Sequence, residues 1–159
     1  MSPLHSLTNN ESGQALVEFA LVLPLLLLLV FGMLDFGKAY NYWNDATHLT
    51  AEGARYAAVN RKPKPLEAAS LQEQILAQAD TTELREGLTS PPIAPAQVCI
   101  DFPNGGSHVS GDPVRMTMTF TYHFLPFIGD EVGFLTKTIT STTVMRLETA
   151  PTTYSAGCT

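Results

Sequence analysis

The longest apolar stretch of the chain lies near its N-terminus. Residues 19–34 contain no charged or hydrogen-bonding side chain, and together with residues 15–18, where only Glu18 is charged, they form a 20-residue segment. A helix rises about 1.5 Å per residue, so this segment measures about 30 Å, the thickness of the hydrocarbon core of a bilayer. A buried helix of a small soluble domain is rarely apolar on every side. We therefore predict a membrane-spanning helix.

This helix is expected to continue outside the membrane, because no proline lies between Pro24 and Pro63. We predict a helix over residues 14–59, with residues 14–35 in the membrane and residues 36–60 outside it. Pro24 should kink it, since proline lacks the N–H that would bond the carbonyl of Ala20. Spacings of four and three predict one helical stripe along the outer half, with the large members first and the small ones later: Phe36, Tyr40, Trp43, Thr47, Thr50, Ala54 and Ala57. Small residues in this half would let another surface approach the backbone closely: Ala46, Ala51, Gly53, Ala54, Ala57 and Ala58. The rings of Tyr40, Tyr42 and Trp43 are expected either in an interfacial aromatic belt or in core packing.

The segment from residue 61 to residue 95 is predicted to hold a linker and a short second helix. The linker contains Pro63 and Pro65, and the helix covers residues 66–80. Its apolar face is formed by Ala68, Leu71, Ile75 and Ala79. A helical turn at residues 81–88 should end at Gly87, and a loop at residues 90–95 should lead onward.

Beyond residue 95 the hydrophobic period changes to two, which is typical of strands. Three strands are predicted within residues 96–149: one at 98–102, one at 114–124 with the clearest alternation, and a threonine-rich one at 136–147. Residues 150–159 form a tail. The expected fold is α+β, in which an antiparallel sheet of about three strands packs on the small residues of the long helix.

Composition and charge narrow the function without identifying it. The chain has 159 residues and a net charge of −6, spread thinly along its length. Nucleic-acid binding needs clustered lysine and arginine, so no nucleic-acid partner is predicted. Common catalytic motifs are missing from the sequence and the four histidines are scattered, so we predict no enzyme, no cofactor and no metal. Asp101, Asn104 and Asp112 have calcium-ligand chemistry, but they are also ordinary turn residues.

The two cysteines form a candidate disulfide. Cys99 lies on the first predicted strand, and Cys158 lies in a tail that would be mobile unless it is tied down. A bond between them would close a loop of about 60 residues, worth ~4 kcal/mol in the chain-entropy model. We favour this intramolecular bond in an exported protein. The alternatives are two free thiols or a bond to another subunit.

Three kinds of segment share an apolar run of this type. A cleaved secretory signal needs a positive N-terminal region, and residues 1–13 contain no lysine or arginine, although residues 37–39 offer a weak cleavage site. A plain single-pass anchor needs only the run itself. A prepilin-type N-terminus needs a specific pattern at the edge of the run, and the chain has it: Gly13, Gln14, Glu18 and Phe19.

That pattern resembles the processing site of type IV pilins. Residues 13–58, with Ala51-Glu52-Gly53-Ala54-Arg55-Tyr56-Ala57 near their end, are similar to TadE-like proteins of the tight-adherence (Tad, or Flp) pilus system. The resemblance implies a minor pilin or pseudopilin with a pilin-like fold, a leader at residues 1–13 and cleavage after Gly13 by a prepilin peptidase. It also implies residence in the bacterial inner membrane and three further partners: other TadE- or TadF-like subunits, the major Flp pilin and the inner-membrane assembly platform.

Glu18 is the residue whose chemistry bears most on assembly. An ionised carboxylate in apolar surroundings costs several kcal/mol unless it is paired. Cleavage after Gly13 would create an ammonium group on Gln14, one helical turn from Glu18, and the pair could form within one chain or between neighbours. Glu18 and Pro24 are therefore the predicted assembly residues. The alternative is a hydrated Glu18 at the depth of the lipid headgroups.

The expected topology contains a conflict. Flanks rich in lysine and arginine tend to stay in the cytoplasm, and here the flank with more of them is the C-terminal one, which begins with Lys38. This rule puts the C-terminal flank in the cytoplasm. The resemblance requires the reverse, with the leader inside and the C-terminal domain in the periplasm or outside. We favour the pilin orientation, because the count rests on one lysine close to Asp35. The competing function is a permanently anchored envelope protein with an outer binding domain and no cleavage.

Overall fold

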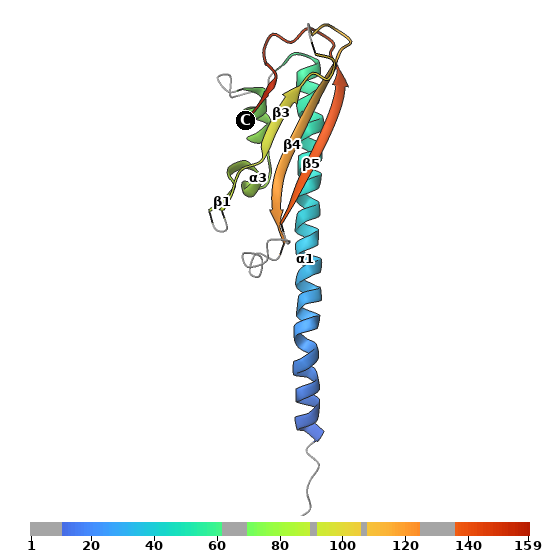
Figure 1. Ribbon diagram of the computed structural model, residues 1–159, viewed down its shortest axis with the longest axis vertical. Coiled ribbons are helices and arrows are strands. Elements are labelled where there is room, and N and C mark those ends of the chain that lie inside the picture. Colours follow the sequence, from blue (N-terminus) through green and yellow to red (C-terminus); the bar gives the residue numbers. More distant parts are fainter. Residues whose placement is uncertain (1–10, 62–69, 90–91, 106–107, 125–135) are drawn as a thin grey trace, which may run out of the picture.

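The molecule consists of one very long helix and a head packed along its distal part (Figure 1). The computed structural model describes residues 11–61, 70–89, 92–105, 108–124 and 136–159. Most of the predicted leader and of the proline-containing linker, and parts of the predicted loops, lie outside these residues. The fold is α+β, with a long N-terminal apolar helix on an antiparallel sheet, as predicted.

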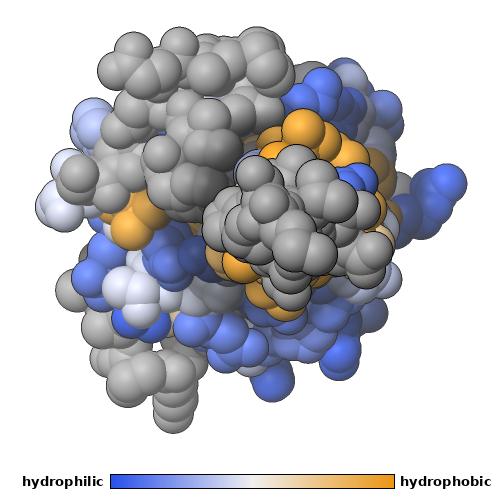
Figure 2. Space-filling view, turned by 90° about the horizontal axis from the view of Figure 1, so that it is seen from below, coloured by the Kyte–Doolittle hydropathy of each residue, from blue (hydrophilic) through white to orange (hydrophobic). Residues whose placement is uncertain are grey.

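Helix α1 runs from Glu11 to Ala58 and continues through Pro24 without interruption (Figure 1). It begins three residues earlier than predicted and ends one residue earlier. Except for the half-buried Leu23, its large apolar side chains between residues 16 and 34 are exposed, from 40% at Leu27 to 78% at Leu21. By length and composition α1 is able to cross a membrane. Seen from below, apolar residues surround its lower end (Figure 2).

The buried face of α1 differs from the predicted stripe by one residue in its first half. Phe36, Tyr40 and Trp43 are exposed, at 66%, 57% and 44%, and Thr47 is exposed as well. The residues that precede Tyr40, Trp43 and Thr47 face the sheet instead: Ala39, Tyr42 and Ala46. Both series have spacings of three and four, so periodicity alone does not choose between them. The two alanines let the sheet approach the helix backbone, which larger aromatic rings would prevent. Later members of the predicted stripe are buried as expected: Thr50, Ala54 and Ala57.

The sheet has four antiparallel strands in the order β5-β4-β3-β6. Strands β3 (Gln97–Asp101), β4 (Pro113–His123) and β5 (Thr136–Arg146) match the three predictions to within one residue at each end. Strand β6 (Gly157–Cys158) lies in the tail and was not predicted. Its two residues have no alternation to detect, and it exists because Cys99 and Ile100 pair with it.

The core lies between α1 and the inner face of β4. Alternate residues of β4 are buried, as predicted from their period of two: Val114, Met116, Met118, Phe120 and Tyr122. The helix packs tightly at Gly53, where an added Cβ would lie 2.7 Å from Cε of Met116. The opposite face of the sheet carries threonines opposed across β4 and β5, with hydroxyls 3.3 Å apart for Thr117 and Thr142.

Two short helices and a small hairpin lie beside the β3 side of the sheet (Figure 1). Helix α2 (Leu71–Leu76) starts at a capping box formed by Ser70 and Glu73. Three residues of its predicted apolar face are buried, Leu71, Ile75 and Ala79, and the fourth, Ala68, lies outside the described residues. The helix ends four residues before the predicted end at Asp80. The backbone N–H groups of residues 78 and 79 bond to the carbonyls three residues before them, and the N–H of Asp80 donates to the Asp45 carboxylate on α1 at 3.1 Å.

Helix α3 (Thr82–Glu86) ends at Gly87, which has the positive φ of 76° that glycine tolerates. The segment predicted as a loop contains strand β2 (Pro92–Ile93), which pairs with β1 (Leu88–Thr89). Two-residue strands leave too short a pattern for period analysis, so the loop prediction was wrong at residues 92–93.

Candidate functional site

The predicted processing residues lie together in the first turns of α1. Gly13, Gln14, Glu18 and Phe19 are all exposed. The side-chain amide of Gln14 donates to Oε1 of Glu18 at 3.0 Å, so these two positions are within one turn and on one face. Pro24 lies further along the same exposed segment. Among the described residues, it forms no hydrogen bond with the head.

The apolar part of α1 is uncovered by the head. None of its most apolar window is buried inside the molecule. Exposing a continuous apolar helix to water is unfavourable by about 25 cal/mol per Å² of apolar surface. The segment therefore needs lipid or partner helices around it, which makes it the principal interaction surface of the chain.

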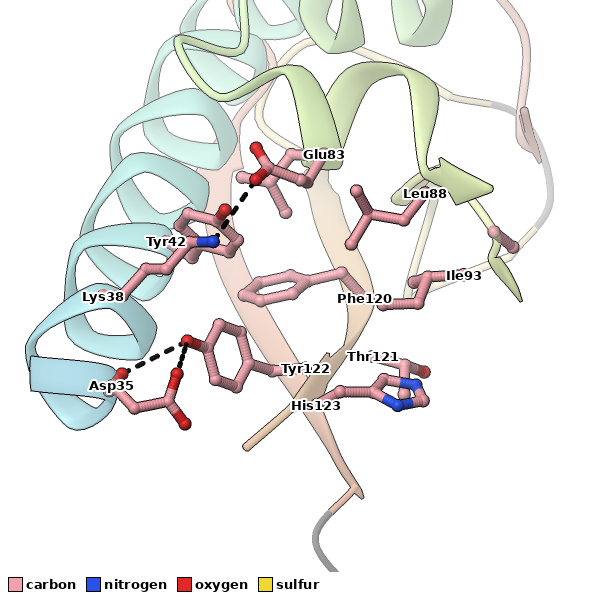
Figure 3. Close-up of a pocket in the computed structure, with 12 residues that line it drawn as sticks. Asp35, Lys38, Tyr42, Glu83, Leu88, Ile93, Phe120, Thr121, Tyr122 and His123 are labelled. Atoms are coloured by element: carbon pink, nitrogen blue, oxygen red, sulfur yellow. Dashed lines mark hydrogen bonds and ion pairs between the residues drawn. The ribbon is translucent and has the colours of Figure 1, made fainter. Parts of the chain in front are cut away.

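A polar contact joins the end of this apolar segment to the base of the head (Figure 3). The hydroxyl of Tyr122, at the end of β4, donates to Oδ1 of Asp35 at 2.7 Å and lies 3.2 Å from the Asp35 carbonyl oxygen. Burial raises the pKa of Tyr122, and the Asp35 carboxylate raises it further. The hydroxyl therefore stays neutral and remains a donor. Tyr42 packs edge-on against the Tyr122 ring, with centroids 5.5 Å apart.

An ion pair lies one turn above, between Nζ of Lys38 and Oε1 of Glu83 on α3, at 3.3 Å. A hydrogen bond from its own backbone N–H, with a smaller contribution from Lys38, lowers the pKa of Glu83. The Lys38 side chain is 54% exposed, so solvent screens the pair and its contribution to stability is small. Together Asp35, Lys38, Glu83 and Tyr122 are called the basal contact.

The basal contact attaches the head to α1, and the hollow beside it is too small to bind an organic ligand. The hollow that it borders, between α1, α3 and β4, has a volume of about 60 Å³. Small-molecule sites usually measure roughly 300 Å³ or more. Within the part of the chain that the structure describes, no cluster of three or more His, Cys, Asp or Glu side chains is arranged to hold a metal. Two of the calcium-candidate residues have other partners: Asp101 pairs with Arg115, and Asp112 accepts from the N–H of Val109.

Buried hydroxyls connect the middle of α1 to β5. The Thr50 hydroxyl lies 3.0 Å from that of Ser141, and both residues are buried. The Thr143 hydroxyl donates to Thr50 at 3.3 Å. Buried polar groups that satisfy one another in this way fix the register between helix and sheet.

At its distal end α1 is tied to the C-terminal tail. Cys99 and Cys158 form a disulfide, and the Tyr154 hydroxyl donates to the Ala57 carbonyl at 2.8 Å. The Asn60 side chain accepts from the backbone N–H groups of residues 152 and 153. The Gln72 amide donates to the carbonyls of residues 155 and 157. We call this set of contacts the tail clasp.

Sequence reasoning missed the basal contact and all of the tail clasp except the cysteines. Asp35 is the first charged residue after the apolar run, and this was the one available signal for a special role. Its partner Tyr122 lies 87 residues away, so no local pattern could pair them.

Comparison with known proteins adds one finding. No curated protein and no solved structure matches the chain. The family model described as TadE-like protein matches residues 13–55. The match starts at Gly13, the glycine of the predicted processing site, and extends along α1 nearly to the tail clasp. Over residues 13–55, which comprise almost all of its long helix, the chain is similar to TadE-like proteins.

Proposed function

We propose that this chain is a minor pilin-like or pseudopilin-like subunit that helps to assemble a Tad (Flp) pilus. The observation that carries the proposal is the position of the TadE-like match. It falls on a helix that is apolar and exposed at one end and packed under a head at the other. Such a helix can insert in a membrane and later pack against other helices, while the head stays outside.

The proposed first step after insertion is cleavage of the peptide bond between Gly13 and Gln14 by a prepilin peptidase. Water is consumed, the leader leaves with the new carboxylate of Gly13, and Gln14 keeps the new amino group. The bond lies within the first turn of α1, which begins at Glu11. The N–H groups of a first turn have no intrahelical acceptor, so local opening for the peptidase costs little.

The new ammonium group and Glu18 supply the proposed basis for lateral association. In the uncut chain the Gln14 side-chain amide donates to Glu18 at 3.0 Å, so residue 14 and the carboxylate lie on one face of the helix, one turn apart. A pair between neighbouring chains would neutralise two charges in apolar surroundings and select one helix register. Proposed partners are the peptidase, other TadE- or TadF-like subunits, the major Flp pilin and the inner-membrane platform.

The proposed topology puts the leader in the cytoplasm and the head in the periplasm. The disulfide between Cys99 and Cys158 supports this orientation, because such bonds persist in oxidising compartments. This argument opposes the lysine count, which rests on Lys38 alone, and Lys38 is paired with Glu83.

Mass spectrometry of the protein isolated from membranes tests the proposal. Cells that contain the Tad peptidase should yield a mature N-terminus at Gln14, and Gly13→Ala should retain the leader. Glu18→Gln should be cleaved but should fail to co-purify with Tad subunits, whereas Glu52→Gln, the same change on the outer half of α1, should associate normally. An intact leader that is unaffected by Gly13→Ala would instead favour the permanently anchored envelope protein.

A further inference from the structure

Directly above its apolar segment, α1 carries three aromatic side chains that the head does not cover. Phe36, Tyr40 and Trp43 are 66%, 57% and 44% exposed. The rings of Tyr40 and Trp43 lie 5.7 Å apart. These three residues, which we call the aromatic flank, follow without a break from the exposed apolar residues Met33 and Leu34.

The aromatic flank occupies one side of the helix only. Each residue advances about 100° around a helix, so the flank lies about a quarter turn from the face buried under the sheet. The adjoining side at the same height is polar and exposed, with Asn41, Asn44 and His48. The charged pair of Lys38 and Glu83 lies beyond the buried face. Aromatic side chains are therefore gathered where lipid could meet them, whereas the other exposed side of the helix at this height is polar.

The height and order of these residues fit the interfacial layer of a bilayer. Seven residues separate Phe36 from Trp43, a rise of about 10 Å. The headgroup layer on each side of the hydrocarbon core is about 5–8 Å thick. Helical side chains lean toward the N-terminus of their helix, here toward the membrane, so the Trp43 ring lies below its own Cα and within reach of this layer. The purely apolar ring of Phe36 is nearest the hydrocarbon, and the rings of Tyr40 and Trp43, which carry polar groups, lie above it. The lipid becomes more polar in the same direction, so this order is favourable.

We propose that the aromatic flank is a lipid-binding surface that anchors α1 in the headgroup layer on the side of the head and so sets the depth of the helix. The inference rests on the membrane insertion in the proposed function. If Phe36 marks the edge of the hydrocarbon, a 20-residue span covers residues 17–36. Glu18 then lies near the opposite edge of the hydrocarbon, within reach of lipid headgroups and of a neighbouring amino group.

Trp43 is the only tryptophan of the chain, so its fluorescence reports on this surface directly. The full chain would be reconstituted at low density in vesicles of phosphatidylcholine and phosphatidylglycerol. Parallel samples would contain lipids brominated near the headgroup or near the end of the acyl chain. We expect blue-shifted emission and a larger loss of Trp43 fluorescence with the shallow label than with the deep one.

Two variants keep the outcomes distinct. In a Trp43→Phe background, Leu25→Trp reports from the span and should be quenched more strongly by the deep label. Val59→Trp reports from the distal end of α1 and should be quenched by neither. Quenching of the Leu25→Trp reporter without quenching of Trp43 would overturn the lipid-binding surface but leave insertion intact. If the Leu25→Trp reporter is not quenched at all, insertion itself fails. Shielding of Trp43 from both lipid labels and aqueous iodide would assign the flank to a protein contact and would also overturn the proposal.

Discussion

Gly53 lies on the packed side of α1 with little free space around it, and its replacement tests how tightly helix and sheet pack. A Cβ at this position would lie 2.7 Å from Cε of Met116 and 3.2 Å from Cγ1 of Ile75, and both of those residues are buried. Alanine is favoured over glycine inside a helix by about 1 kcal/mol, whereas overpacking a core costs about 1–3 kcal/mol. The packing cost should exceed the gain in helix propensity. We therefore expect Gly53→Ala to lower the free energy of unfolding of the head by about 1 kcal/mol.

Gly37 supplies the matched control on the same helix, since a Cβ there meets nothing within 4 Å. Gly37→Ala should raise the free energy of unfolding by up to about 1 kcal/mol. Denaturant unfolding of the full chain in detergent, followed by near-ultraviolet circular dichroism, measures both variants. In a Met116→Ala background the penalty of Gly53→Ala should disappear, because the clashing methyl group is gone. If Gly53→Ala stabilises the head as much as Gly37→Ala, the close approach of helix and sheet is refuted.

Three further changes probe the disulfide, the basal contact and the tail clasp. Cys99 and Cys158 are 59 residues apart, and replacing both by serine should lower the free energy of unfolding by about 4 kcal/mol. The same denaturant assay measures the change. A loss below about 1 kcal/mol would show that the tail stays docked without the bond. Tyr122→Phe removes the donor to Asp35 and should cost about 1–2 kcal/mol, with faster amide exchange around residue 35 and unchanged exchange in β3. Burial raises the pKa of Tyr154 from 10.0 to about 12, so its contribution to stability is complete below pH 10 and is lost as the pH rises to about 12. Tyr154→Phe should abolish this part of the alkaline destabilisation, as followed by tyrosinate absorption and the denaturation midpoint, and an unchanged alkaline profile would contradict it.

The elements that sequence reasoning predicted well are those with long, regular patterns. The alternation in β4 extends over eleven residues, and each inward position from Val114 to Tyr122 is buried. The apolar run of α1 fixes a helix regardless of what surrounds it. In β4 the period of two is repeated often enough to exclude a helix, and in α1 the length of the uniformly apolar run indicates a membrane-spanning helix.

The errors arise where the local structure is determined by contacts with residues distant in sequence. The packed side of α1 depended on whether alanine or aromatic side chains face the sheet, and two stripes one residue apart have the same period. Strand β6 depends on pairing with Cys99, and the end of α2 depends on Asp45 of α1. The candidate site divides in the same way: the motif at Gly13 and Glu18 is local in sequence, whereas the basal contact is not.

The attachment of the head to α1 has a mechanical consequence. The head is fastened near Asp35 by the basal contact, at Thr50 by buried hydroxyls and at Asn60 by the tail clasp, over 25 residues or about 37 Å of helix. The strands β4 and β5 run roughly along this length (Figure 1). A force that draws the helix along its axis therefore loads all three attachments in shear at once, instead of peeling them apart in turn. Because the described residues attach the head to the helix at three heights, the head should follow the helix as one body.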